Sequence, residues 1–210
     1  MQLIKVFSLF LLSFIFSSLS AYSLVKIDDN SVDLAIKYGV KMKGNSVENI
    51  LGTNWKNDGS GRILNIYSPF IQVAMKSTTK PSSGELDEDI KTVKNLLKYD
   101  ITKVKNRNEV RFLVSFYGDN ADFAKNCKAY IVEANKFSKD LKEQDKITPK
   151  KTSVQKIADK DNFHPKHPFS AVNCYTFKFD KIFNLKEYYF ILVSDNKEEV
   201  RYKINNEEIF

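Results

Sequence analysis

The residue types best suited to chemistry gather between residues 163 and 179, where the sequence reads FHPKHPFSAVNCYTFKF. This stretch holds both histidines of the chain, His164 and His167, together with Cys174, one of its two cysteines. Imidazole and thiolate groups are common zinc ligands, and a thiol next to an imidazole can act as an activated nucleophile. The stretch therefore raises two hypotheses, a metal site and a nucleophilic site.

The spacing of the two histidines argues against a metal site. His164 and His167 each precede a proline, and a residue before proline is pushed out of the helical region toward extended geometry. At about 3.1 Å per residue their backbones lie about 9 Å apart, whereas each imidazole must come within about 2.1 Å of a zinc ion. The loop would have to bend and recruit Asp161 as a third ligand. We expect exposed polar histidines in a stiff loop, with metal binding as the alternative, and we predict no cofactor.

The N-terminus predicts export. Residues 1–23, MQLIKVFSLFLLSFIFSSLSAYS, combine a positive charge at Lys5, an apolar run and a tail of small residues, which is typical of a secretory signal peptide. The apolar run of about a dozen residues is shorter than the roughly 20 needed to span a bilayer, and no nearby cysteine could carry a lipid. We expect residues 24–210 to form a single periplasmic, cell-surface or secreted domain that does not span a membrane.

The two cysteines suit an exported chain in another way. Cys127 and Cys174 are an even pair, and each stands at or near the start of a predicted strand. If those strands are neighbours, a disulfide would close a loop of about 47 residues; otherwise one or both are buried free thiols. A hydrolase that uses Cys174 with His167 is a weaker hypothesis, because residues this close along a strand usually point apart and no G-x-S-x-G motif occurs.

The charge of the chain comes mostly from lysine. The formal net charge is +7, and arginine occurs at only four positions: Arg62, Arg107, Arg111 and Arg201. Bidentate recognition of phosphate favours the planar guanidinium of arginine, so we predict no specific nucleic-acid partner. A lysine-rich surface of this kind is attracted mildly to anionic polymers and membranes.

Two other polar segments are better explained by structure than by chemistry. The acids in GELDEDI, residues 84–90, suit the first turn of a helix, where they interact with the helix dipole. The loop NWKNDGSGR, residues 54–62, has neither the Lys-Ser/Thr ending of a phosphate loop nor the acid spacing of a calcium loop. Its tryptophan, Trp55, fills the core beneath the loop or anchors a partner.

Hydrophobic periodicity predicts an α+β fold. Spacings of three and four predict a helix over 31–43, capped by Ser31 or Asn30, a turn over 47–51, a helix that begins at Ser68-Pro69, and a helix over 85–99. Strands are predicted at 62–67, 109–119, 128–134, 171–180, 186–195 and 198–204. The polar segment 136–161 is expected to be a loop with one helical turn near residues 154–158. The C-terminal half should thus form an antiparallel sheet or sandwich, packed with helices from the N-terminal third.

Aromatic residues of the late strands should supply much of the core. Tyr175, Phe177 and Phe179 are predicted to share one face, and Tyr188, Phe190 and Leu192 another. If both faces of the strand around Tyr188 are apolar, that strand is central and covered on both sides.

Four segments resemble a family of uncharacterised exported bacterial proteins: NIYSPFIQVA, YGDNADFA, SAVNCYTFKF and the ending YKINNEEIF. In that family a strand runs into a helix that starts with Ser/Thr-Pro-aromatic, and late antiparallel strands close the domain. The resemblance implies a single domain over most of the mature chain. It implies no activity, ligand or catalytic residue.

These observations favour an exported non-catalytic protein that binds another protein or a component of the cell envelope. One alternative is a carrier of a small hydrophobic ligand, with an aromatic pocket between sheet and helices. The other is the hydrolase that uses Cys174 and His167.

Overall fold

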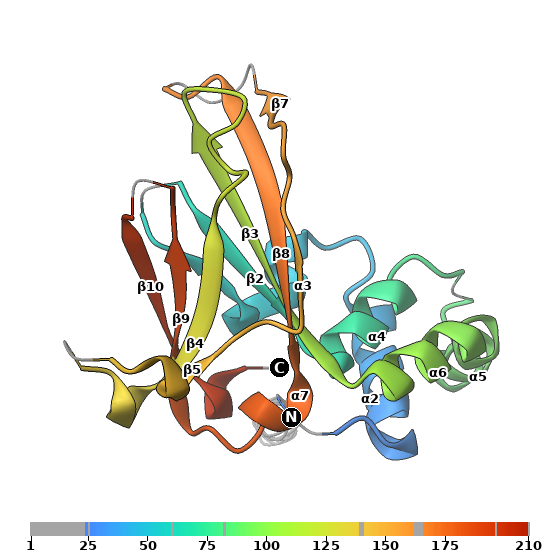
Figure 1. The fold of residues 1–210 in the computed structure, drawn as a ribbon. Helices are drawn as coiled ribbons and strands as arrows, with labels where there is room; N and C mark the ends of the chain where they lie inside the picture. The colour runs from blue at the N-terminus through green and yellow to red at the C-terminus, as the bar shows by residue number, and fades with distance from the viewer. Residues whose placement is uncertain are drawn as a thin grey trace, which may run out of the picture.

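Two antiparallel sheets and a group of helices make up the fold, which is α+β as predicted (Figure 1). The computed structural model describes residues 24, 26–59, 61–81, 83–138, 141–161, 166–195 and 197–209. The predicted signal peptide, residues 1–23, lies outside the described residues. Across the described ranges, no helix is both long enough and apolar enough to cross a bilayer.

Polar side chains cap the first N–H groups of the first three helices that the structure describes, whereas the other three begin without a side-chain cap. The helices are α2 (Asp29–Lys41), α3 (Val47–Leu51), α4 (Pro69–Ser77), α5 (Leu86–Leu96), α6 (Lys98–Arg107) and α7 (Phe179–Ile182). Ser68 caps α4 and Pro69 occupies its first turn, as predicted. The predicted cap of α2 is wrong by at least two residues. Asp28 is the cap, and its carboxylate accepts a bond from the Ser31 N–H at 2.8 Å, so that Ser31 is the third helical residue of a capping box.

The helix predicted over 85–99 is two helices, α5 and α6, separated only by Leu97. The apolar spacing continues past residue 99, because Val93, Leu97, Ile101 and Val104 are all buried. The prediction ended the helix too early, at the point where exposed charged residues become more frequent than apolar ones. Helix α6 also forms one wall of a pocket.

All strand pairs are antiparallel, but the strands divide between two sheets. The six-stranded sheet contains β1 (Trp55–Asn57), β2 (Ile63–Tyr67), β3 (Glu109–Gly118), β8 (Phe169–Lys178), β6 (Lys151–Ser153) and β7 (Asp159–Lys160). The other sheet contains β10 (Glu199–Asn205), β9 (Glu187–Val193), β4 (Lys128–Glu133) and β5 (Lys146–Ile147). Consecutive strands β3 and β4 belong to different sheets, so the C-terminal half is a sandwich of interleaved strands.

Three details of the loops differ from prediction. The segment 54–62, expected to be a loop, begins with β1, which pairs with β2 from Trp55 onward. The segment 136–161 contains the short edge strands β5, β6 and β7. The helical turn predicted at 154–158 is a bend, since Gln155 there bonds to β8 through its backbone N–H and side-chain oxygen.

Side chains of β3 alternate between the core that lies between the two sheets and the opposite face of the six-stranded sheet. Val110, Phe112, Val114 and Phe116 are buried between the sheets, where the Phe112 and Phe190 rings stack at 4.9 Å. Tyr175, Phe177, Tyr188 and Leu192 join this core as predicted, and Phe179 is buried too although it begins α7 rather than ending a strand. Strand β9 is central, between β10 and β4, as its two apolar faces suggested.

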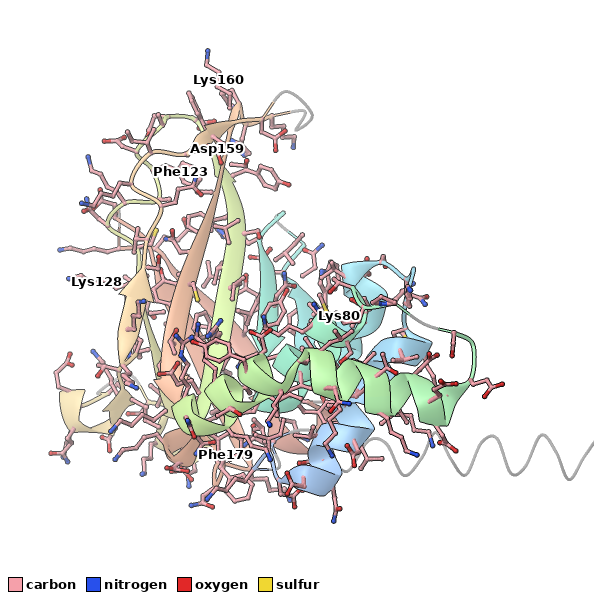
Figure 2. All side chains as sticks on the ribbon, turned by 90° about the vertical axis from the view of Figure 1, so that its right-hand side faces the viewer. Lys80, Phe123, Lys128, Asp159, Lys160 and Phe179 are labelled. Atoms are coloured by element: carbon pink, nitrogen blue, oxygen red, sulfur yellow. The ribbon has the colours of Figure 1, made fainter. Side chains whose placement is uncertain are left out.

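The helices cover one end of the opposite face of the six-stranded sheet. Figure 2 shows α5 and α6 crossing in front of the sheet, while β3 and β8 extend beyond them toward Asp159 and Lys160. A second apolar cluster, drawn mainly from α2, α4, α5 and α6, includes Trp55 and Tyr67 at its border. Trp55 is therefore partly buried against the helices.

Two buried tyrosines provide a stability test of the core. Tyr188 is 0% exposed and its hydroxyl has no hydrogen-bond partner among the described residues, whereas the Tyr175 hydroxyl donates to the Cys127 carbonyl oxygen at 3.1 Å. We expect Tyr175→Phe to lower the free energy of unfolding by about 1 kcal/mol, and Tyr188→Phe to leave it unchanged or raise it by up to about 1 kcal/mol. Urea unfolding of both variants measures the difference; equal losses would contradict it.

Candidate functional site

The described histidine lies at the far end of the sandwich, away from the helices. His167 Nδ1 is 2.7 Å from Asp119 Oδ1, just beyond the end of the β3 and β8 pair. Asp161 is nearby, since its N–H donates to the Pro168 carbonyl oxygen. His164 lies outside the described residues, so the two-histidine metal site stays a prediction. Within the described ranges, no three His, Cys, Asp or Glu side chains are grouped to hold a metal.

The disulfide hypothesis is corrected by the structure, in which Cys127 and Cys174 are both free thiols. The neighbours of Cys174 explain why. Asn173 and Tyr175 point into the core, where they bond to the carbonyl oxygens of Ala124 and Cys127. Because side chains alternate along a strand, Cys174 must point to the opposite face. Strand β8 does approach Cys127, which lies just before β4, but through the side chain of Tyr175 and not through that of Cys174.

The same strand separates Cys174 from His167. Cys174 is five residues along the regular strand from Phe169, a distance of about 17 Å at 3.3 Å per residue, and His167 lies beyond the start of that strand. Cys174 instead has its sulfur 3.9 Å from the Thr176 hydroxyl oxygen. Cys174 and His167 therefore do not form a pair of nucleophile and base.

The acidic and turn segments have the structural roles that the sequence indicated. Asp87, Glu88 and Asp89 stand in the first turn of α5, and the buried Asp89 carboxylate accepts bonds from Ser83 and Gly84. The turn between β1 and β2 is closed by the Asp58 N–H donating to the Arg62 carbonyl oxygen.

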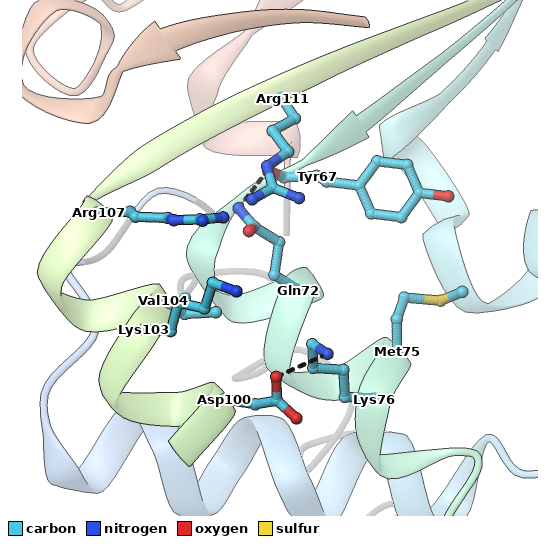
Figure 3. Close-up of a pocket in the computed structure, with 9 residues that line it drawn as sticks. All are labelled: Tyr67, Gln72, Met75, Lys76, Asp100, Lys103, Val104, Arg107 and Arg111. Atoms are coloured by element: carbon cyan, nitrogen blue, oxygen red, sulfur yellow. Dashed lines mark hydrogen bonds and ion pairs between the residues drawn. The ribbon is translucent and has the colours of Figure 1, made fainter. Parts of the chain in front are cut away.

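The feature with the clearest binding chemistry is a basic pocket between α4, α6 and the ends of β2 and β3. Its volume is about 310 Å³. Figure 3 shows its lining, in which Lys103 and Arg107 come from α6 and Arg111 from β3. Tyr67, Met75 and Val104 add apolar surface. We call it the basic pocket below.

Local structure brings the two arginines of the basic pocket together. Arg107 ends α6 and Arg111 lies on β3, and Asn108 between them adopts a left-handed conformation with φ 47° that turns the chain from helix to strand. The Asn108 side chain donates to Asp180, and the Phe179 N–H donates to the Asn108 carbonyl oxygen, so the turn is held on both sides.

Helix α4 is tied to the same strand ends. The Gln72 side-chain amide donates to the carbonyl oxygens of Tyr67 at 3.2 Å and Glu109 at 2.9 Å. One side chain therefore joins α4 to β2 and β3 at the floor of the basic pocket. Burial raises the pKa of Tyr67, so its phenol does not add a negative charge to the basic pocket even at moderately alkaline pH.

The charge of the basic pocket is not balanced. Asp100 is the one carboxylate among the lining residues, and it pairs with Lys76 at 2.9 Å. Lys103, Arg107 and Arg111 have no ion-pair partner in the part of the chain that the structure describes. Three cations around a small hollow with one apolar side can bind a carboxylate or a phosphate group.

Another pocket, on the outer face of the four-stranded sheet, offers a contrast. There Arg201 pairs with Glu199 at 2.9 Å and lies over the Phe137 ring, while Lys146 pairs with Glu143. Because Lys146 and Arg201 are already paired with carboxylates, we expect this pocket to bind an anion less strongly than the basic pocket does.

The sequence offered little sign of the basic pocket. Arginine is scarce in this chain, and that scarcity argued against a nucleic-acid partner, yet two of the four arginines line one hollow. The only local signal was Arg107-Asn108 at the junction of a helix and a strand. Asparagine tolerates the left-handed conformation that reverses a chain, and such a reversal can bring Arg107 and Arg111 to the same side.

Comparison with known proteins adds no family assignment: no family model matches the chain, and no curated protein does. The resemblance to exported bacterial proteins therefore remains a prediction.

The thiols allow a direct test of the strand orientation. Burial raises the pKa of Cys127, whereas Cys174 is half-buried on the other face. In native protein without reductant we expect iodoacetamide to modify Cys174 first, and Cys127 only after unfolding. Mass spectrometry of the labelled peptides measures this, and an unlabelled pair linked to each other would contradict it.

Proposed function

We propose that the chain is an exported, non-catalytic binding protein, and that its basic pocket receives an anionic group of a cell-envelope component. The observation that carries this proposal is the set of three cations without carboxylate partners, Lys103, Arg107 and Arg111, around one hollow. Like charges held close together repel each other, so a bound carboxylate or phosphate relieves that repulsion as well as forming charge-assisted hydrogen bonds. The predicted signal peptide supports the assignment to the envelope.

The two alternatives have less support. A carrier of a hydrophobic ligand needs an apolar pocket between sheet and helices, but the hollow between α4, α6 and the six-stranded sheet is lined by the cations Lys103, Arg107 and Arg111. A hydrolase that uses Cys174 and His167 needs them in contact, and strand β8 holds them apart. The basic pocket has no nucleophile and base pair among its lining residues.

Removing the arginines should weaken anion binding. We expect Arg111→Gln to reduce the affinity for inorganic phosphate about tenfold or more, and Arg107→Gln/Arg111→Gln to abolish it, because a hydrogen bond to a charged group contributes about 1.5 to 3 kcal/mol. Glutamine keeps much of the length of arginine without its charge. Isothermal titration with phosphate, and with succinate as a carboxylate probe, measures the change.

The matched control is Arg201→Gln, which removes an arginine from β10, where Glu199 already pairs with it. It should leave phosphate affinity unchanged. Raising the salt concentration should weaken binding to the wild type, since salt screens charges at an exposed pocket. Equal phosphate affinity in the wild type and the double arginine variant would show that the basic pocket is not the anion site.

A further inference from the structure

We propose that the anionic group recognised by the basic pocket is the phosphate of a phospholipid headgroup, and that α5 and α6 dock on an anionic membrane surface with Leu96 and Tyr99 at the lipid interface. This inference rests on the proposed function and adds the class of ligand and the orientation of the protein on it.

The first observation is an exposed apolar pair beside the basic pocket. Leu96 is 56% exposed and Tyr99 is 77% exposed, although Leu97 between them is buried. A leucine and a tyrosine facing water gain by entering a membrane interface, where tyrosine places its ring among the headgroups and leucine reaches the acyl boundary.

The second observation is the position of this pair on the helix. Helical hydrogen bonds continue across the junction of α5 and α6, from the Leu97 N–H to the Val93 oxygen at 2.9 Å and from the Ile101 N–H to the Leu97 oxygen at 2.8 Å. Leu96, Tyr99 and Lys103 are therefore spaced by three and four on one side of the helix. Lys103 belongs both to this row and to the lining of the basic pocket, and its Nζ lies 5.8 Å from the centre of the Tyr99 ring.

The third observation is the charge of the same surface. Arg107 follows Lys103 by four residues on the side of the helix that carries the exposed apolar pair, and neither cation has an ion-pair partner among the described residues. The lysines that pair with acids of α2, Lys94 and Lys105, lie on a different side of the helix. An excess of unpaired positive charge next to exposed apolar side chains complements an anionic lipid surface.

Membrane docking requires both the exposed apolar pair, Leu96 and Tyr99, and the basic pocket. Two apolar side chains are too few to hold a protein on a membrane, and a cationic hollow alone does not distinguish a lipid from a free anion. Together they place a phosphate site and an apolar contact on one face of α6. An acidic protein partner would satisfy the charges but would not require Leu96 and Tyr99 to meet hydrocarbon.

The experiment is co-sedimentation of the full mature chain with vesicles of phosphatidylcholine containing about 30% phosphatidylglycerol, against vesicles of phosphatidylcholine alone. The wild type should bind the anionic vesicles and not the neutral ones. Leu96→Ser/Tyr99→Ser should weaken vesicle binding about tenfold, because it removes the apolar contact, and leave phosphate affinity unchanged. Arg107→Gln/Arg111→Gln should lose both activities.

The matched control is Val47→Ser/Ile157→Ser, which removes two exposed apolar residues elsewhere and should bind vesicles as the wild type does. Phosphate binding without vesicle binding would overturn this inference while leaving the proposed function intact, and loss of both in the wild type would overturn both. Full vesicle affinity of Leu96→Ser/Tyr99→Ser would show that the lipid contact is wrong. Equal displacement of that variant and of the wild type from vesicles by polyglutamate would show the same and would indicate an acidic partner.

Discussion

The structure depends on the packing of the two sheets against each other, with the stack of Phe112 on Phe190 at its centre. Because β3 has a period of two, burying Phe112 commits every other residue of the strand to the opposite face. Arg111 is next to Phe112, so it has to point toward the helices, where it lines the basic pocket. Strand β8 imposes the same constraint, since burying Tyr175 turns Cys174 away from Cys127.

A second constraint is the junction of α6 with β3. A helix and the following strand can meet at a sharp angle only if one residue leaves the right-handed region, and Asn108 does so. Its bonds to Asp180 and to the Phe179 N–H attach this junction to the end of β8. The Gln72 amide attaches α4 to the same place. The walls of the basic pocket are thus fixed by hydrogen bonds that do not involve its cationic side chains, which are available to interact with a ligand.

The cations of the helical layer include some that pair with acids of the chain and others that line the basic pocket without a partner among the described residues. Several lysines pair with acids across the helical layer, as Lys94 does with Asp33 and Lys105 with Asp29. Exposed pairs of this kind contribute little stability. Cations left unpaired around a hollow contribute none and repel one another, which suggests that they serve an interaction outside the chain. Leu96 and Tyr99 fit the same interpretation, because side chains that stay exposed contribute little to the stability of the isolated protein.

The sequence by itself determined the α+β class, the long strands and the capped start of α4, because these depend on local periodicity and on the chemistry of residues such as Ser68 and Pro69. The spacing of Ile101 and Val104 also indicated that the helix continues past residue 99, although the prediction ended it there. Residue types could not show that strands alternate between two sheets or that Trp55 begins a strand, since partners distant in sequence decide both. The candidate site also depends on partners that are distant in sequence. Tertiary structure decided that Arg107 and Arg111 meet and that Cys174 does not meet Cys127, because the side of a strand on which a residue lies follows from which of its neighbours the core buries.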